Sequence, residues 1–130
     1  MQSVLIIEDS HVLRRLLEVS LSPLGLDVHT ATTITEGKRA VMGLKPNVVI
    51  LDIGLPDGNG TELLTWIRED NNLSNVKVVM ASGLANNSDI EWALNAGASG
   101  FVTKPYTPDD IRHAVLELLA GAETATGATF

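Results

Sequence analysis

The chain of 130 residues contains no cysteine. Disulfide bonds, thiolate metal sites and cysteine nucleophiles are therefore excluded, and we expect a cytoplasmic protein. Long apolar runs are lacking too, because each run has only a few residues, against the roughly 20 that a membrane-spanning helix needs. The first residues show neither a basic stretch nor a signal-peptide cleavage pattern, so we expect no secretion signal and no membrane partner.

Positive charge is scarce as well. Lysine and arginine number 9 against 16 aspartates and glutamates, which gives a net charge of −7. This imbalance argues against direct binding of nucleic acid or anionic lipid by this domain. A separate DNA-binding domain on a longer parent chain stays open. The 45% of apolar residues indicates a globular chain, long enough for one domain with its own core.

Short apolar runs alternate with helix-like segments along the chain. The expected strands are residues 4–7, 28–32, 48–51, 76–80 and 101–102. Continuous apolar strands of this length are typical of a parallel sheet that is covered on both faces. The segments between them place apolar residues at helical spacing. Ser10 and Ser88 suit the N-caps of the first and fourth helices, and Gly97 suits the end of the fourth.

The pattern predicts an α/β fold with five strand–helix repeats, in which a doubly wound, five-stranded parallel sheet forms the middle of a three-layer sandwich. The run 28–32 alternates with polar residues and the run 101–102 is short, so we place both at the sheet edges. The flavodoxin-like (βα)5 order 2-1-3-4-5 has these two edges. We expect one domain over residues 1–120, and a flexible tail or the start of a linker over residues 121–130.

Acidic and polar side chains come directly after the predicted strands. Glu8 and Asp9 follow the first strand and Asp52 follows the third, while Ser82 and Lys104 come shortly after the fourth and fifth. Ligands of open α/β sheets bind outside the carboxyl ends of the strands. If the first and third strands are neighbours, the three carboxylates converge at one end of the sheet.

Such convergence needs a counter-charge, because two like charges about 4 Å apart repel by roughly 4 kcal/mol at an effective dielectric of 20. Carboxylate and carbonyl oxygens are the ligands that Mg²⁺ prefers, and Mn²⁺ accepts them too. Lys104 offsets one of the three negative charges and a divalent cation offsets the other two. A neutralised site can admit an anionic phosphoryl donor, with Asp52 as the nucleophile and Ser82 and Lys104 around the phosphoryl oxygens.

Each of these residues has a plainer interpretation when taken alone. A Glu-Asp pair in a loop is usually a solvated surface or a helix cap, and aspartate favours turns anyway. Ser82 can be a turn hydroxyl, and Trp92 and Ile90 can be ordinary helix packing, which we favour for Trp92. The joint pattern favours function, because each group lies one or two residues beyond a different buried strand.

Four stretches taken together resemble the receiver domain of two-component response regulators (CheY-like). They are residues 4–10 (VLIIEDS), 48–60 (VVILDIGLPDGNG), 78–83 (VVMASG) and 96–106 (AGASGFVTKPY). Each stretch alone is weakly specific, but their order and spacing are highly specific, and the resemblance covers about residues 3–119. It implies a phosphoacceptor switch rather than an enzyme, although the switch assists its own phosphorylation and dephosphorylation.

The resemblance also implies roles for individual residues. Asp52 would accept the phosphoryl group from a phosphohistidine of a sensor histidine kinase or phosphotransfer protein. The expected ligands of Mg²⁺ or Mn²⁺ are the carboxylates of Glu8, Asp9 and Asp52 and the backbone carbonyl of Ile53. The expected phosphate contacts are Ser82, Gly83 and Lys104. The residue Pro105 resembles a proline that often follows a cis bond in this family.

The same resemblance implies a conformational switch. Ser82 would move toward the phosphoryl group and Phe101 would turn inward, so that the face of the fourth helix, fifth strand and fifth helix changes. We expect Ile90 and Tyr106 on that face. Gly54 and Leu84 would tune the rates, and Gly54 leaves the phosphoryl site more open to water or to a partner. The output would be a downstream protein or a C-terminal domain absent from this chain, and a homodimer through the same face is a family-level option.

Three rival functions are less consistent with the residues. A phosphatase with an aspartyl-phosphate intermediate needs an acid two residues after its nucleophile, but this position is Gly54. A flavin-binding electron carrier needs a hydroxyl- and glycine-rich phosphate loop after the first strand, where Glu8 and Asp9 would repel the phosphate. A degenerate receiver that serves only for protein contacts would not need the complete set of acceptor groups.

Overall fold

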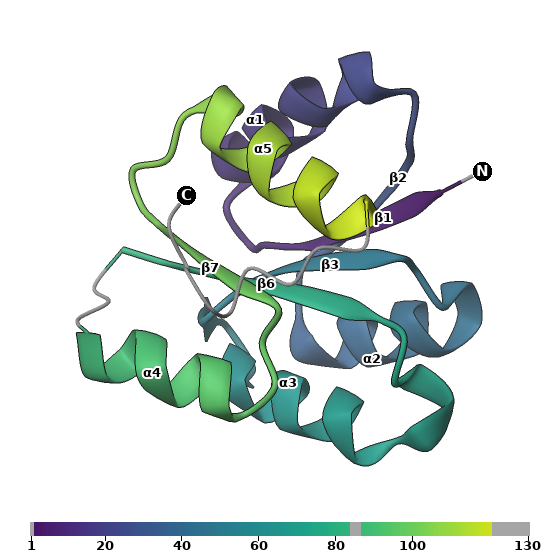
Figure 1. The fold of residues 1–130 in the computed structure, drawn as a ribbon, viewed down its shortest axis with the longest axis vertical. Coiled ribbons are helices and arrows are strands. Elements are labelled where there is room, and N and C mark those ends of the chain that lie inside the picture. The colour runs from purple at the N-terminus through teal and green to yellow at the C-terminus, as the bar shows by residue number, and fades with distance from the viewer. Residues whose placement is uncertain (1, 84–86, 121–130) are drawn as a thin grey trace.

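A computed structural model describes residues 2–83 and 87–120, apart from the side chains of residues 87–89. Five parallel strands form the central sheet in the order β2-β1-β3-β6-β7 (Figure 1). They are β1 (Ser3–Ile7), β2 (Asp27–Ala31), β3 (Val48–Asp52), β6 (Lys77–Ser82) and β7 (Gly100–Thr103). Counted among the parallel strands alone, this is the predicted order 2-1-3-4-5, and the two predicted edge strands lie at the edges.

Five helices cover the two faces of this sheet. They are α1 (His11–Leu21), α2 (Ile34–Leu44), α3 (Gly60–Glu69), α4 (Asn87–Asn95) and α5 (Pro108–Leu119). Helices α1 and α5 lie on one face, and α2, α3 and α4 lie on the other (Figure 1). The predicted three-layer sandwich is therefore confirmed. Within the described ranges, no helix combines the length and the apolar character that crossing a membrane requires.

Local capping explains where several helices begin and end. The Ser10 hydroxyl accepts the Leu13 N–H at 3.3 Å, as predicted for the first helix. Thr107 opens α5 with a capping box, in which it exchanges hydrogen bonds with Asp110. Gly97 follows α4 with a φ of 106°, a left-handed conformation that glycine adopts without strain. Helix α4 begins at Asn87, so the predicted cap Ser88 lies inside it, and its side chain is outside the described residues.

The core consists of two apolar layers, one on each face of the sheet. Leu5 and Ile7 of β1 pack toward the layer under α2, α3 and α4, whereas Val4 and Ile6 pack toward the layer under α1 and α5. Since successive side chains point to opposite faces, a central strand with both faces covered must be apolar throughout. This is why β1 and β3 read as uninterrupted apolar runs.

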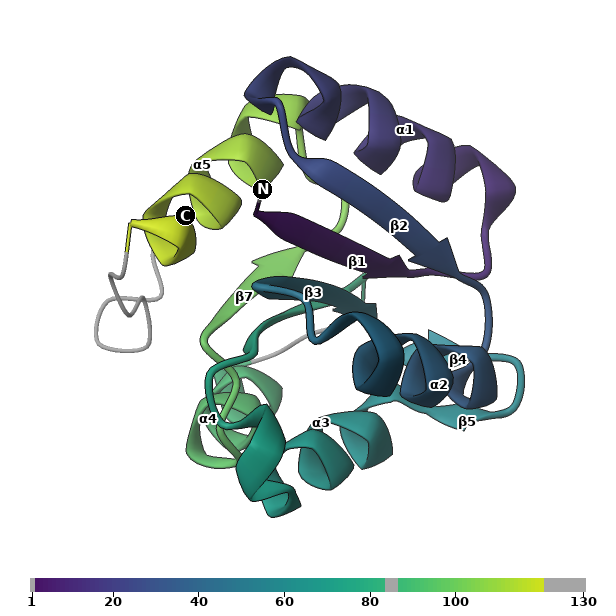
Figure 2. The same ribbon diagram turned by 90° about the vertical axis from the view of Figure 1, so that its right-hand side faces the viewer.

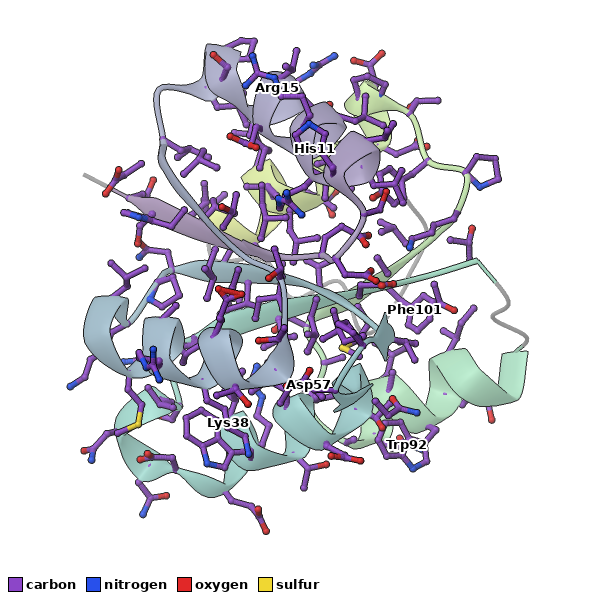
Figure 3. All side chains as sticks on the ribbon, turned by 180° about the vertical axis from the view of Figure 1, so that it is seen from behind. His11, Arg15, Lys38, Asp57, Trp92 and Phe101 are labelled. Atoms are coloured by element: carbon purple, nitrogen blue, oxygen red, sulfur yellow. The ribbon has the colours of Figure 1, made fainter. Side chains whose placement is uncertain are left out.

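A small antiparallel hairpin between β3 and α3 was not predicted. It consists of β4 (Gly54–Leu55) and β5 (Gly58–Asn59). The ribbon of this hairpin lies beside α2 (Figure 2), and Asp57 at its tip is labelled in Figure 3. After the hairpin the chain returns close to β3. A β-carbon on Gly60 would lie only 2.2 Å from the carbonyl oxygen of Asp52. Glycine is therefore required at Gly60 for α3 to start there.

Candidate functional site

Three carboxylates meet at the carboxyl end of the sheet. Glu8 and Asp9 follow β1 and Asp52 ends β3, and these two strands are direct neighbours. One carboxylate oxygen of each residue lies within 4.8 Å of the others. Glu8 and Asp52 are buried, at 2% and 6% exposure, whereas Asp9 is exposed. The predicted convergence is confirmed, and three hard oxygen donors around one point fit Mg²⁺ or Mn²⁺.

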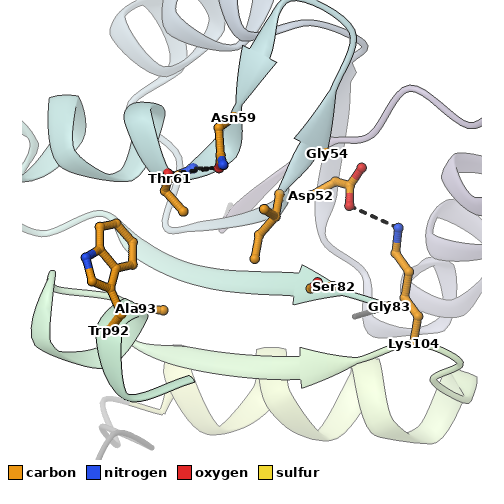
Figure 4. A pocket seen from close by; sticks show the side chains of 10 residues that line it. Asp52, Gly54, Asn59, Thr61, Ser82, Gly83, Trp92, Ala93 and Lys104 are labelled. Carbon is orange, nitrogen blue, oxygen red and sulfur yellow. Dashed lines mark hydrogen bonds and ion pairs between the residues drawn. The ribbon is translucent and has the colours of Figure 1, made fainter. Parts of the chain in front are cut away.

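Lys104, in the loop after β7, is the cation at this site. Its Nζ lies 3.0 Å from Asp52 Oδ1 and 3.3 Å from Glu8 Oε1, and the side chain is 22% exposed. Figure 4 shows the Lys104 side chain reaching toward Asp52 from the end of β7. The Lys104–Pro105 peptide bond in this loop is cis. One ammonium group therefore pairs with Glu8 and Asp52. Set against the three formal negative charges of the acids, it leaves two for a divalent cation to offset.

Burial and the neighbouring charges shift the protonation equilibria at the site. Burial raises the pKa of Glu8, the Ser10 N–H opposes this by hydrogen bonding, and the nearby Asp52 charge raises it further. Burial also lowers the pKa of Lys104, but its contacts with Asp52 and Glu8 outweigh burial and raise it above its usual value. Lys104 therefore stays charged, and the acids carry repulsion that a bound cation would relieve.

The loop that carries Glu8 and Asp9 is held by groups at the start of α1. The Ser10 N–H donates to Glu8 Oε2 at 3.1 Å. The Arg14 guanidinium donates to the backbone carbonyls of Glu8 and Asp9 at 3.1 and 3.3 Å. Sequence reasoning missed Arg14. An arginine one turn into the helix after the acidic pair is the only hint of this contact in the sequence.

A cavity of about 570 Å³ opens beside Asp52 (Figure 4). Its lining is Asp52, Ile53, Gly54, Asn59, Thr61, Ser82, Gly83, Trp92, Ala93 and Lys104. The predicted phosphate contacts Ser82, Gly83 and Lys104 thus share one space with Asp52. The expectation that Trp92 is ordinary packing is wrong, because its side chain is 47% exposed and forms part of the cavity wall.

The glycines of this cavity differ in how much room they have. Among the residues that the structure describes, a β-carbon on Gly54 would meet nothing within 4 Å, and this agrees with the predicted openness of the site on this side. A β-carbon on Gly83 would lie 3.6 Å from Lys104 Cβ, an ordinary contact that alanine can make. The other residue predicted to tune the rates, Leu84, lies outside the described residues.

The backbone carbonyl of Ile53, predicted as a metal ligand, already accepts a hydrogen bond. The Gly60 N–H donates to it at 2.7 Å. A carbonyl oxygen has a second lone pair, so the bond does not remove Ile53 as a ligand, but it directs one side of the oxygen toward α3. Gly54 lines the same cavity and offers the next carbonyl along the chain.

Two aromatic residues of the predicted switch lie in unexpected places. Phe101 is 4% exposed and belongs to the core under α4, so in this conformation it is already turned inward. Tyr106, expected on the surface, is only 8% exposed and packs in the core under α5. Among the described residues its buried hydroxyl has no hydrogen-bond partner. Burial, together with the nearby Glu8 charge, raises the pKa of Tyr106 to about 12.

Comparisons with known proteins agree with this geometry. The KDP operon transcriptional regulatory protein KdpE of Escherichia coli (strain K12) is 40% identical over 106 residues, which cover 82% of this chain and 46% of that protein. KdpE of Staphylococcus aureus (strain NCTC 8325 / PS 47) is 35% identical over 133 residues, which cover 100% of this chain and 56% of that protein. The chain thus spans about half the length of these relatives.

Solved structures show the same arrangement of strands and helices. The receiver domain protein (CheY-like) of Methanospirillum hungatei JF-1 superposes with a TM-score of 0.85 at 30% identity, covering 93% of this chain and 95% of that one. A model of the response regulator receiver domain family matches residues 4–116. That match includes the three acids, Lys104 and nearly the whole fold, and so the chain belongs to the response regulator receiver domain family.

Proposed function

We propose that this chain is the phosphoacceptor switch of a two-component system in the cytoplasm. Asp52 takes a phosphoryl group from a phosphohistidine on a sensor histidine kinase or phosphotransfer protein. The observation that supports the proposal is the set of three carboxylates within 4.8 Å of one another, with Lys104 Nζ 3.0 Å from Asp52. Neither a surface acid cluster nor a structural ion pair needs this arrangement beside an open cavity.

The site residues supply positioning and charge for the transfer. A carboxylate oxygen of Asp52 forms the new P–O bond while the P–N bond to the donor imidazole breaks, and the imidazole leaves with the bonding pair and is protonated. Lys104, already beside Asp52, contacts the transferred oxygens, and the Ser82 hydroxyl and the Gly83 backbone approach them from the end of β6, next to Lys104. When bound by Glu8, Asp9, Asp52 and a carbonyl of Ile53 or Gly54, Mg²⁺ supplies positive charge to the phosphoryl oxygens.

Phosphorylation then changes the face formed by α4, β7 and α5. It replaces a single carboxylate charge by about two charges and three acceptor oxygens, and Ser82 lies at the end of β6, where the chain leads toward α4. A second cavity of about 250 Å³, lined in part by Ile90, Phe101 and Tyr106, provides room for repacking on that face. Phe101 is already buried before phosphorylation, so the proposed switch favours this position of the ring rather than creating it.

The output is a second part of the proposal. The KdpE relatives are named transcriptional regulatory proteins and are about twice as long as this chain. We propose that the α4–β7–α5 face controls an output of that kind, either a further domain or a separate protein, directly or through a homodimer. The chain itself, with its net charge of −7, has no role in binding DNA.

Labelling with a small phosphodonor tests the proposal. The chain is incubated with acetyl phosphate and Mg²⁺, and intact mass reports the gain of one phosphoryl group. We expect a gain that EDTA abolishes and that Asp52→Asn loses, while the matched variant Asp27→Asn, at the amino end of the sheet, is labelled like the wild type. A wild-type chain that is never labelled, or an Asp52→Asn chain that is, contradicts the proposal and favours an interaction module without phosphorylation.

A further inference from the structure

The β4–β5 hairpin forms one wall of the cavity beside Asp52, and a single side chain ties its tip to another element. Asp57 Oδ1 accepts the Ile34 N–H at 2.8 Å. Asp57 Oδ2 accepts the Thr35 N–H at 3.2 Å and the Thr35 hydroxyl at 3.1 Å. The bonds join positions more than twenty residues apart in the chain, and they place the carboxylate at the start of α2 (Figure 3).

The start of α2 is a favourable place for this carboxylate. The first N–H groups of a helix have no partner within the helix, and the helix dipole attracts negative charge there. The helix already has its own N-cap, because the Thr33 hydroxyl accepts the Glu36 N–H at 3.1 Å. Asp57 therefore takes up, from outside the helix, the N–H groups of the two residues before Glu36, which are Ile34 and Thr35. These bonds, led by the one from Ile34, keep the pKa of Asp57 below its usual value.

On the cavity side of the hairpin, Asn59 Oδ1 accepts the Thr61 N–H at 2.9 Å and the Thr61 hydroxyl at 2.8 Å, but these bonds do not involve Gly54. A β-carbon on Gly54 would meet no atom of the described residues within 4 Å, so no described side chain packs against this residue from the cavity. The position of Gly54 depends on its pairing with Asn59 and on the far side of the hairpin. On that side Leu55 is buried, and Gly58 approaches α2 so closely that a β-carbon would lie 2.8 Å from Ile34 Cδ1.

We propose that Asp57 is a positioning residue that sets the affinity of the site for Mg²⁺. Its bonds to Ile34 and Thr35 fix the hairpin, and so hold the backbone carbonyl of Gly54 where a cation shared with Asp52 can use it. The Ile53 carbonyl is held separately, by the Gly60 N–H. This inference rests on the proposed function, since it concerns the same metal site. Residues that support ligands from outside typically change metal affinity by 10- to 100-fold when they are removed.

A plain helix-capping role for Asp57 predicts a different result, and Thr33 provides the matched control. Thr33→Ala removes a cap from the same helix end without touching the hairpin. Asp57→Ala removes the link between helix and hairpin. If Asp57 only stabilised α2, both variants would lose thermal stability and neither would change Mg²⁺ affinity.

The experiment measures Mg²⁺ dissociation constants by calorimetry on the full chain, without a phosphodonor. We expect Asp57→Ala to raise the constant roughly tenfold, and Asp57→Asn, which keeps one acceptor oxygen, to raise it less. Thr33→Ala should lower the melting temperature and leave the constant unchanged. Should Asp57→Ala fail to fold, Asp57→Asn and Thr35→Val carry the test, because each removes part of the link.

Two results would overturn the inference. One is a folded Asp57 variant that binds Mg²⁺ as tightly as the wild type, and the other is a Thr33→Ala chain that is weakened as much as Asp57→Ala. A wild-type chain that binds no Mg²⁺ would overturn it as well. Failure of the proposed function is distinguishable, because it would appear as a wild-type chain that binds Mg²⁺ but takes no phosphoryl group.

Discussion

The two ends of the central sheet accommodate their polar side chains in opposite ways. At the amino end, Asn47 joins three strands through neutral hydrogen bonds. Its side chain accepts the Ser3 N–H at 2.9 Å, its N–H donates to the Ser3 carbonyl at 3.0 Å, and its carbonyl accepts the Lys77 N–H at 3.0 Å. At the carboxyl end of the same strands, Glu8 and Asp52 are buried as acids beside one lysine.

The comparison indicates that the carboxyl end is the less stable of the two, and that its charges serve the proposed function. Neutral pairing at the amino end satisfies polar groups at little cost. Burying two carboxylates with a third nearby leaves charge that the protein alone does not balance, and such repulsion is tolerated mainly at functional sites. We therefore expect the carboxyl end to respond strongly to Mg²⁺ and the amino end not to respond at all.

The largest effect on stability is expected at Gly60, which packs against the backbone of Asp52 at the acidic end of the sheet. Gly60→Ala would place a β-carbon 2.2 Å from the Asp52 carbonyl oxygen, a backbone atom with little freedom to move. We expect a loss of about 3 kcal/mol in the free energy of unfolding, measured by urea denaturation. Gly83→Ala is the control at the same end, and it should change stability by less than about 0.5 kcal/mol. Equal effects of the two variants would refute the steric argument.

Mg²⁺ should raise the free energy of unfolding by binding at the carboxyl end, and this gain should depend on Asp9. At 100 times its dissociation constant, a ligand of the folded state adds about 2.7 kcal/mol. Asp9→Asn removes an exposed ligand and part of the repulsion, so we expect this variant to be more stable than the wild type by about 1 kcal/mol without Mg²⁺. It should gain far less from the cation. Thermal unfolding with Mg²⁺ or with EDTA measures both effects, and an equal gain for both chains would exclude Asp9 as a ligand.

Much of this site was predictable because its residues come directly after apolar strands in the sequence. The apolar runs of β1 and β3 show that both faces of these strands are covered, and the residue that follows a parallel strand must lie at the same end of the sheet as its counterparts. Glu8, Asp52 and Lys104 could therefore be brought together from the sequence. The polar alternation of residues 28–32 likewise placed β2 at the edge.

The remaining features depend on packing that no spacing rule expresses. Strands β4 and β5 have two residues each and no apolar period, so the hairpin left no pattern. The bonds of Asp57 join segments far apart in the chain. The burial of Tyr106 depends on how the loop after β7 folds over the core under α5, whereas its sequence position only suggested a surface residue.

Tyr106 should make the free energy of unfolding depend on pH, which gives a further test of burial near the carboxyl end. Its pKa is raised from 10.0 to about 12, chiefly by burial, so the folded state holds the proton more tightly than the unfolded state. The associated stability is complete below pH 10 and is lost as the pH rises from 10 to 12. We expect Tyr106→Phe to reduce the loss of unfolding free energy between pH 8 and pH 11 by about 1 kcal/mol. Urea titrations at both pH values measure it, and parallel losses would show that the phenol ionises as freely as in water.

The smallest effect is expected at the amino end. Asn47→Ala removes the side-chain acceptor of the Ser3 N–H, an exposed bond, and keeps both backbone bonds of residue 47. The freed N–H can bond to water, so we expect a loss of only about 0.5 to 1 kcal/mol in unfolding free energy. The loss should be the same with Mg²⁺ and with EDTA, because no charge at this end depends on a cation. A loss that changed with Mg²⁺ would mean that the two ends of the sheet are energetically coupled through β1 and β3, and the division between a neutral structural end and a charged functional end would not hold.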